Sequence, residues 1–456
     1  MHTLRPLTLK TALALGVGLA ALGGPAAHAQ DAPAAHAQDA PAAPANGPGP
    51  ATQPPPPPGT AQPAPTQPAA PATPPGTTGG TAPAPAAPAP APPNYKLQYN
   101  GLIDGYYLFQ FHNPKDTNTI TGRAYDIRHN TPALALAELN VFQVAPPKSF
   151  GYKATLIAGD VADLNSFSFV GGSPPALVHN DLGEGRFKNV QQLYGTYAFG
   201  ADGSGVDVGK FYTPFGYEVT EANGNYNYSR SVAYNYVPFY HAGLRIYTPV
   251  PGLAALTATF YLVNGVFNTA TMGVQNDSKR PGYMGQLNYT DPKGKFTLIS
   301  ELGLDKQKFY GETGPDTKVV VNDNNFTYNF NANQLFGLDY VYRKTTPEGG
   351  GKETVNAYAV YYRQALTPKT AFALRYSGAQ DKYEGGLGGL ADGSVRPNEV
   401  TATYEVKPTT NFTTRLEYRH DSVNSDNVLG YAFVDKDGSV TKKNQDTLTL
   451  AGLFTF

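Results

Sequence analysis

Apolar and polar residues alternate with a period of two along most of the chain between residues 94 and 456. The alternation is clearest at residues 336–343, 399–406, 412–419 and 447–456. Each segment has an apolar side and a side that is mostly polar or charged, as a β-strand does when its two faces meet different surroundings. No apolar run in this region is long enough for a membrane-spanning helix. The pattern therefore predicts an all-β domain.

The charged side of the alternation separates two kinds of β fold. A soluble sandwich turns its polar face to water and its apolar face to a core, whereas a membrane barrel turns its apolar face to lipid and its polar face to a wet lumen. Charged residues make up only 15% of the chain and aromatic residues 12%, nearly all Tyr and Phe. This composition suits strands and membrane interfaces. We therefore predict a transmembrane antiparallel β-barrel.

Short turns and longer connections alternate along this region, as in bacterial barrels with short periplasmic turns and long outer loops. Seven turns and eight loops join sixteen strands and leave both ends on the periplasmic side. The weakest predicted strand spans residues 318–330, and a chain without that hairpin would have fourteen strands. The turns are predicted at residues 146–147, 202–203, 249–252, 291–294, 331–333, 368–369 and 408–411, and the loops at 112–132, 163–187, 213–238, 265–281, 305–317, 345–352, 380–397 and 421–445.

The first residues have the features of a secretory signal. A basic start is followed by an apolar stretch at residues 11–22 and by Ala-His-Ala ending at Ala29. A second Ala-His-Ala ends at Ala37, so the cleavage site is either of the two. The alternative, a transmembrane anchor, needs a longer apolar run. We predict a signal peptide at residues 1–29.

Residues 30–93 consist almost wholly of Ala, Pro, Gly, Thr and Gln. Such a segment cannot bury enough apolar surface to offset the entropy lost on ordering. We predict a disordered Pro/Ala-rich periplasmic linker, acting as a spacer or as an arm that docks to an envelope partner, before a barrel domain at residues 94–456.

Four motifs resemble a known family. Three of them are similar to the signature region of the OmpL-like β-barrel porins, or porin-2: Gly-Lys-Phe-Tyr-Thr-Pro-Phe-Gly-Tyr-Glu-Val at 209–219, Asn-Tyr-Asn-Tyr-Ser-Arg at 225–230 and Tyr-His-Ala-Gly-Leu-Arg at 240–245. The fourth, Tyr-Leu-Val-Asn-Gly at 261–265, resembles the end of the next strand in that family. The resemblance implies an outer-membrane channel. The terminal Phe456 is similar to the C-terminal signature of chains that the outer-membrane assembly machinery receives.

The long loop at residues 213–238 joins the fifth and sixth predicted strands. It resembles the loop that folds inward and narrows the channel in sixteen-stranded porins. The alternative is an outward loop whose tyrosines lie at the lipid headgroups. The residues expected in a constriction are Tyr217, Glu218, Glu221, Tyr226, Tyr228 and Arg230.

Charged residues on the polar side of the later strands are candidates for lining the pore. They would set the electric field that a solute crosses, or pair with one another across strands for stability. These residues are Asp339, Arg343, Arg363, Arg375, Glu399, Glu405, Arg415, Glu417 and Arg419.

The sequence gives little support for thiol chemistry, metal binding or nucleic-acid binding. The chain has no cysteine, its eight histidines show no metal-ligand spacing, and its formal net charge of −1 does not indicate nucleic-acid binding. We predict no cofactor, no metal and no catalytic residue. The expected partners are outer-membrane lipid, small polar solutes or ions, and further copies of the chain in a trimer. Alternatives are a structural tethering barrel and a barrel hydrolase using His112, His129 or His179.

Overall fold

The computed structural model describes residues 94–115, 117–165, 167–170, 176–179, 188–266, 280–308, 316–386, 392–425 and 432–456. The predicted signal peptide and linker lie outside the described residues.

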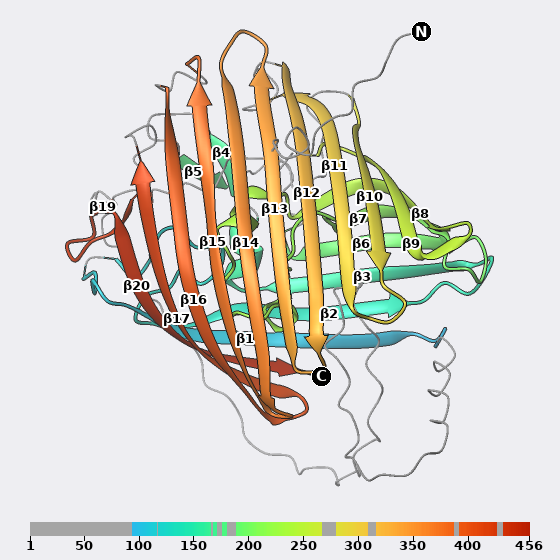
Figure 1. The fold of residues 1–456 in the computed structure, drawn as a ribbon, viewed down its shortest axis with the longest axis horizontal. Helices are drawn as coiled ribbons and strands as arrows, with labels where there is room; N and C mark the ends of the chain where they lie inside the picture. The colour runs from blue at the N-terminus through green and yellow to red at the C-terminus, as the bar shows by residue number, and fades with distance from the viewer. Residues whose placement is uncertain are drawn as a thin grey trace, which may run out of the picture.

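The described strands form one closed antiparallel barrel of sixteen strands, as predicted (Figure 1). The barrel strands, in spatial order, are β1 (Gln98–Gln110), β2 (Pro132–Gln143), β3 (Phe150–Ala158), β6 (Val190–Ala198), β7 (Gly205–Tyr212), β8 (Tyr240–Val250), β9 (Leu253–Val263), β10 (Gly282–Thr290), β11 (Phe296–Lys308), β12 (Asp316–Asn331), β13 (Gln334–Pro347), β14 (Lys352–Thr367), β15 (Thr370–Glu384), β16 (Gly393–Thr409), β17 (Phe412–Ser425) and β20 (Asn444–Thr455).

Small elements lie in the loops of the barrel. The described ones are the hairpin of β4 (Phe167–Val170) and β5 (Ala176–His179), the helix α1 (Asp160–Leu164), the 3-10 helices Ala222–Gly224 and Ala233–Tyr236, and the hairpin of β18 (Phe433–Val434) and β19 (Val440–Lys442). No helix among the described residues is both long and apolar enough to cross a membrane.

Strand β12 decides between sixteen and fourteen strands. It pairs along its length with β11, from Asp316 opposite Lys308 to Tyr328 opposite Phe296, and with β13 on its other side. Its outer residues carry asparagines where a lipid-facing strand is usually apolar, which made the strand hard to recognise. The fourteen-stranded alternative is therefore wrong.

All seven predicted turns join the expected strands, but several predicted loops are shorter than expected. Strand β15 continues to Glu384, β17 continues to Ser425, and β16 begins at Gly393. These ends lack the apolar side that marks a lipid-facing strand, yet their backbone groups still pair across the ladder. The strands thus extend beyond the part that the alternation reveals.

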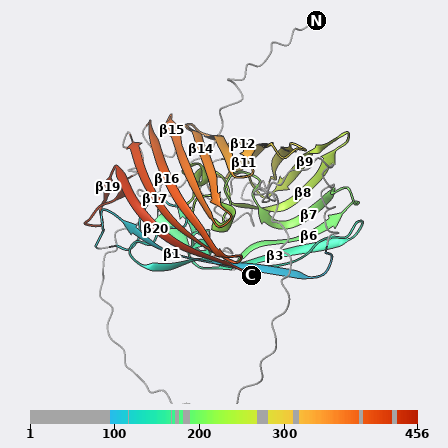
Figure 2. The ribbon, with the colours of Figure 1, turned by 60° about the horizontal axis from the view of Figure 1, so that its bottom comes forward.

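The first and last barrel strands close the sheet. The N–H of Gly101 donates to the Phe456 carbonyl at 3.0 Å, and the N–H of Thr455 donates to the Asn411 carbonyl at 2.8 Å. The C-terminus therefore lies at the rim that carries the short turns, and Figure 2 shows β20 meeting β1 there. Closure leaves no unpaired sheet edge in lipid.

The two faces of the wall differ as the alternation predicts. On β16, Val400 and Tyr404 face outward and are 49% and 43% exposed, whereas Glu399 and Thr401 face inward and are 1% and 0% exposed. The inward polar groups of β16 are thus covered by other protein groups.

Candidate functional site

The loop between β7 and β8, residues 213–239, contacts the inner face of the barrel wall. Its second 3-10 helix, Ala233–Tyr236, packs against β13, β14 and β15. Where the loop begins, the hydroxyl of Tyr212, the last residue of β7, donates to the carboxylate of Glu221 in the loop. Several apolar loop residues, among them Phe215 and Val237, belong to a buried cluster with valines and alanines of β12, β13 and β14.

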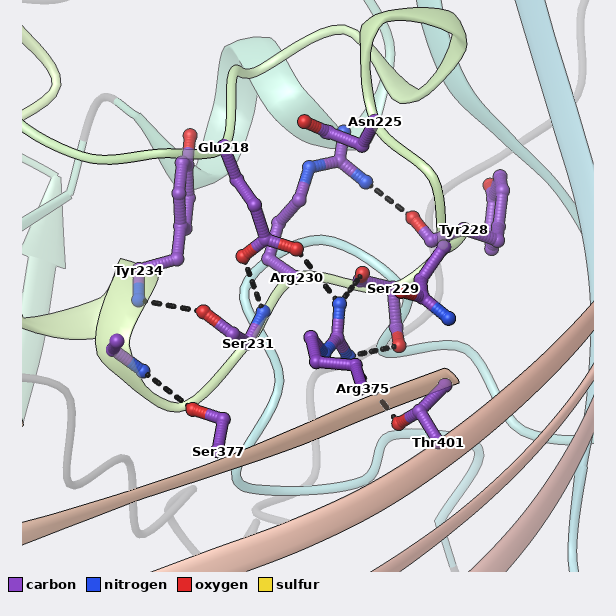
Figure 3. Close-up of polar contacts among 12 residues, drawn as sticks. Glu218, Asn225, Tyr228, Ser229, Arg230, Ser231, Tyr234, Arg375, Ser377 and Thr401 are labelled. Carbon is purple, nitrogen blue, oxygen red and sulfur yellow. Dashed lines mark hydrogen bonds and ion pairs between the residues drawn. The ribbon is translucent and has the colours of Figure 1, made fainter. Parts of the chain in front are cut away.

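Arg375 of β15 joins this loop to the wall. Its Nη1 donates to Glu218 Oε1 at 2.7 Å and to the Ser229 carbonyl at 2.5 Å, and its Nη2 donates to Ser229 Oγ at 3.0 Å. Its Nε donates to Glu399 Oε1 of β16 at 2.6 Å. One enclosed guanidinium thus holds two segments of the loop against two strands (Figure 3).

Two arginines of β17 hold backbone carbonyls of the same loop. Arg415 donates from Nη1 to the Ala222 carbonyl and from Nη2 to the Asn225 carbonyl, both at 2.7 Å. Arg419 donates from Nη1 to the Arg230 carbonyl at 2.5 Å. Carbonyls buried in a loop need such donors, because an unpaired buried carbonyl is costly.

A carboxylate of the wall also binds the loop, because it accepts hydrogen bonds from N–H groups of the loop backbone. Glu417 of β17 accepts from the N–H groups of Tyr228 and Ser229 at 2.5 Å and 3.0 Å. On the same wall, Arg343 of β13 and Glu353 of β14 form a buried ion pair at 2.8 Å. The wall therefore offers charged donors to the loop carbonyls and charged acceptors to the loop N–H groups.

Tyr217 fits closely against the wall. Its ring stacks on Tyr361 with centroids 4.5 Å apart, and its hydroxyl lies 2.9 Å from Thr327 Oγ1. The Tyr226 ring lies 6.3 Å from that of Tyr217. A Cβ at Gly337 would overlap the Tyr217 hydroxyl, so glycine there makes room for the loop.

The far side of the loop reaches β1. The Tyr228 hydroxyl donates to Asp104 Oδ1 at 2.9 Å. Burial raises the pKa of Tyr228 well above its ordinary value, so this hydroxyl keeps its proton and remains a donor. Arg230 donates from Nε to the Val219 carbonyl at 3.0 Å and so braces the loop against itself.

All nine side chains predicted to line the pore lie on the inward side of their strands, and eight of them are no more than 5% exposed. The ninth, Arg363, has a side chain that is 17% exposed and lies 3.3 Å from Glu405. The contacts of these groups are largely with the loop and with one another. Direct contact with a passing solute stays a prediction.

Ion pairs between residues that the sequence pattern did not single out also face inward. Arg245 of β8 donates from Nε to Asp207 Oδ2 of β7 at 2.7 Å, and Arg123 in the first loop lies 3.2 Å from Asp421. Asp207 and Arg245 are paired in register, and Asp207 stands between two valines. That alternation was a usable signal for Asp207, whereas nothing local indicated Arg123.

The histidines considered for hydrolysis lie near backbone atoms. His129 Nδ1 accepts from the N–H of Gln110 at 3.0 Å, and His112 Nδ1 lies 3.3 Å from the Val434 carbonyl. The side chain of His179 lies outside the described residues. In the part of the chain that the structure describes, no group of three His, Cys, Asp or Glu residues is placed to hold a metal ion.

The closed sixteen-stranded barrel with charged groups on its inner face defines an outer-membrane barrel of the porin class. The family model described as beta-barrel porin-2, OmpL-like, matches residues 96–456, and the chain belongs to this family. No curated protein sequence matches the chain.

Solved structures share the fold at low identity. The outer-membrane channel DcaP of Acinetobacter baumannii is 11% identical, with a TM-score of 0.52, over 79% of this chain and 97% of that one. OmpF of Salmonella typhi, in complex with daunomycin, is 15% identical, with a TM-score of 0.51, over 79% and 98%. The trimer form of OmpT from Vibrio cholerae is 11% identical, with a TM-score of 0.50, over 79% and 99%.

Proposed function

We propose that this protein is a porin through which small polar solutes or ions diffuse passively across the outer membrane. The loop of residues 213–239 narrows the lumen, so pore size and the electric field of the inner face decide what passes. No covalent step is involved.

The attachment of this loop to the inner wall carries the proposal. Arg375, Arg415 and Arg419 donate to the loop, and Glu417 accepts from it. Charge-assisted hydrogen bonds are the stronger ones, and four such groups reach one loop from two strands, β15 and β17. A loop held in this way sets a constant opening, as a size filter requires.

We also propose how the chain is exported, assembled and organised in the cell envelope. Residues 30–93 form a periplasmic linker behind a cleaved signal of residues 1–29, the assembly machinery recognises the segment ending at Phe456, and three barrels assemble into a trimer. Membership of the porin family supports the outer-membrane location.

Planar-bilayer recording with a salt gradient tests the function. We expect stepwise conductance increases as channels insert, and a reversal potential whose sign gives the ion preference. The control is the same preparation after heat denaturation, which should give no steps. A folded, heat-modifiable barrel that gives no conductance in repeated reconstitutions contradicts the proposal.

A further inference from the structure

An open-sided cavity of about 200 Å³ lies between the start of the loop and the walls of β6 to β12. At about 30 Å³ for each water molecule, this is roughly the space of six waters, close to the size of one sugar ring. The groups facing it are aromatic rings, aliphatic and proline side chains, amides and hydroxyls, with two charged residues among them. The lining includes Tyr212, Phe215, Tyr261, Gln286, Asn288 and Thr297.

The two charged residues that line the cavity, Glu218 and Arg245, are each neutralised by a neighbour. Glu218 pairs with Arg375 at 2.7 Å, and Arg245 pairs with Asp207 at 2.7 Å. Arg245 is further held by the Phe211 ring, 4.9 Å from its guanidinium carbon. A charged solute entering here would lose water without finding an uncompensated partner, which is costly.

Amides screen the nearest carboxylates from the cavity. Gln286 donates from Nε2 to Glu301 Oε1 at 2.8 Å, and Asn325 donates from Nδ2 to Glu301 Oε2 and Asp323 Oδ1, both at 3.4 Å. These amides use their N–H groups on the carboxylates behind them.

Two acceptors in the lining have no hydrogen-bond partner within the described part of the chain. They are the buried Oδ1 atoms of Asn288 and Asn325, and Asn325 is itself only 4% exposed. A buried amide oxygen without a donor costs free energy, and a solute hydroxyl can supply that donor. The aromatic rings add apolar faces of the kind that cover the C–H surface of a ligand.

We propose that this cavity binds a small uncharged polyhydroxylated solute of about the size of a monosaccharide. The inference rests on the proposed porin function and names the solute class of that pore. Solute hydroxyls donate to Asn288 and Asn325, and the solute's apolar face lies against the rings of Tyr212 and Tyr261. The cavity thereby delays such solutes in the channel relative to ions.

The test is the effect of solutes on ion current through single channels of the full chain in planar bilayers. D-glucose is the neutral probe, and D-gluconate, D-glucosamine and the zwitterion serine are probes with charge. We expect glucose to cause saturable current interruptions at concentrations at which the three charged probes cause none.

Two conservative variants locate the effect. Asn288→Leu removes an acceptor and Thr297→Val removes a hydroxyl, and each should weaken glucose binding about fivefold to tenfold, as the loss of one hydrogen bond does. Thr449→Val is the matched control, because Thr449 is buried on β20 outside the lining of the cavity. It should leave both glucose binding and the conductance without glucose unchanged.

The outcomes separate this inference from the porin function. A wild-type channel that conducts ions but shows no saturable response to glucose overturns the solute class and leaves the porin function standing. Interruptions by gluconate, glucosamine or serine as strong as those by glucose also overturn it, since the site would then not select uncharged solutes. Absence of any conductance overturns the porin function itself.

Discussion

At the scale of single residues, three inward arginines help to attach the loop to the wall. Arg375, Arg415 and Arg419 are each no more than 3% exposed, and each has both a carboxylate partner and a loop carbonyl. Their planar guanidinium groups present several donors at once, which lysine cannot do in the same geometry. The sequence indicated that these residues face inward, but their partners in the loop follow from the fold.

Replacing Arg375 with Met should loosen the loop. The change leaves Glu218 and Glu399 buried without their shared partner, and breaking a buried ion pair costs about 3–5 kcal/mol. We expect a lower unfolding temperature, and larger and noisier single-channel conductance. Heat-modifiability gels and bilayer recording measure the two effects.

Arg363→Met is the matched control for that variant. The Arg363 side chain is 17% exposed, and Glu405 keeps Arg415 at 2.7 Å when Arg363 is removed. We expect a change of no more than about 1 kcal/mol in stability and unchanged channel noise. Equal effects of the two variants would contradict the anchoring role of Arg375.

Gly337→Ala should also displace the loop, because a side chain added to the wall would push against it. The added Cβ would overlap the Tyr217 hydroxyl and push the ring away from Tyr361, at a cost of about 1–3 kcal/mol for overpacking. We expect altered conductance with the barrel still folded. Gly195→Ala is the control, since no atom lies within 4 Å of its added Cβ, and a conductance equal for both variants would contradict the close fit.

At the scale of elements, strand pairing and side-chain alternation determine different things. Pairing alone carries the strands beyond the lipid-facing part, as β17 shows by continuing to Ser425. Closure depends on the pairing of β20 with β1, where Gly101 and Phe456 exchange backbone hydrogen bonds. The Phe456 ring also covers Gly101, whose missing side chain makes room for it.

Phe456→Ala should lower the amount of folded barrel in the outer membrane. It removes the ring that covers Gly101 at the closing seam, and with it the proposed recognition by the assembly machinery. We expect several-fold less heat-modifiable protein in membrane fractions, with normal conductance of the molecules that do fold. Phe456→Tyr keeps the aromatic ring and should assemble normally; equal assembly of the two variants would contradict a role for the ring.

At the scale of the whole molecule, the protein combines an apolar exterior with an interior that contains many charged groups. The formal net charge of −1 conceals buried ion pairs such as Arg343 with Glu353 and Arg245 with Asp207. Charged groups that line a pore act on ions, whereas an uncharged solute is selected by its size and its hydrogen bonds.

Deleting residues 30–93 while keeping residues 1–29 and the barrel should leave single-channel conductance unchanged. Every loop contact described above is made by residues of the barrel domain, so the pore does not need the Pro/Ala-rich segment. Conductance of the purified deletion variant, compared with that of the full chain, measures this. A chain whose main role is tethering would instead lose its cellular phenotype on deletion, with the barrel still assembled.

The sequence by itself determined the barrel. Alternation with period two is a local property, because each side chain on a strand points opposite to the next, and turn residues between such segments count the strands. It also identified the loop of residues 213–238 as unusual and placed the nine charged candidates on the inward side. It could not trace β12 securely, because its outer asparagines hide the pattern.

The tertiary structure decided what the inward groups touch. Arg375 and Ser229 are separated by 146 residues, and Asn227 and Thr403 by 176, so no local pattern predicts that they meet. The pairing of Arg245 with Asp207, the fit of Tyr217 against Gly337 and the cavity beside the loop likewise depend on how the closed wall brings distant strands around one loop. Local side-chain direction follows from backbone geometry, whereas these contacts exist only after the barrel closes.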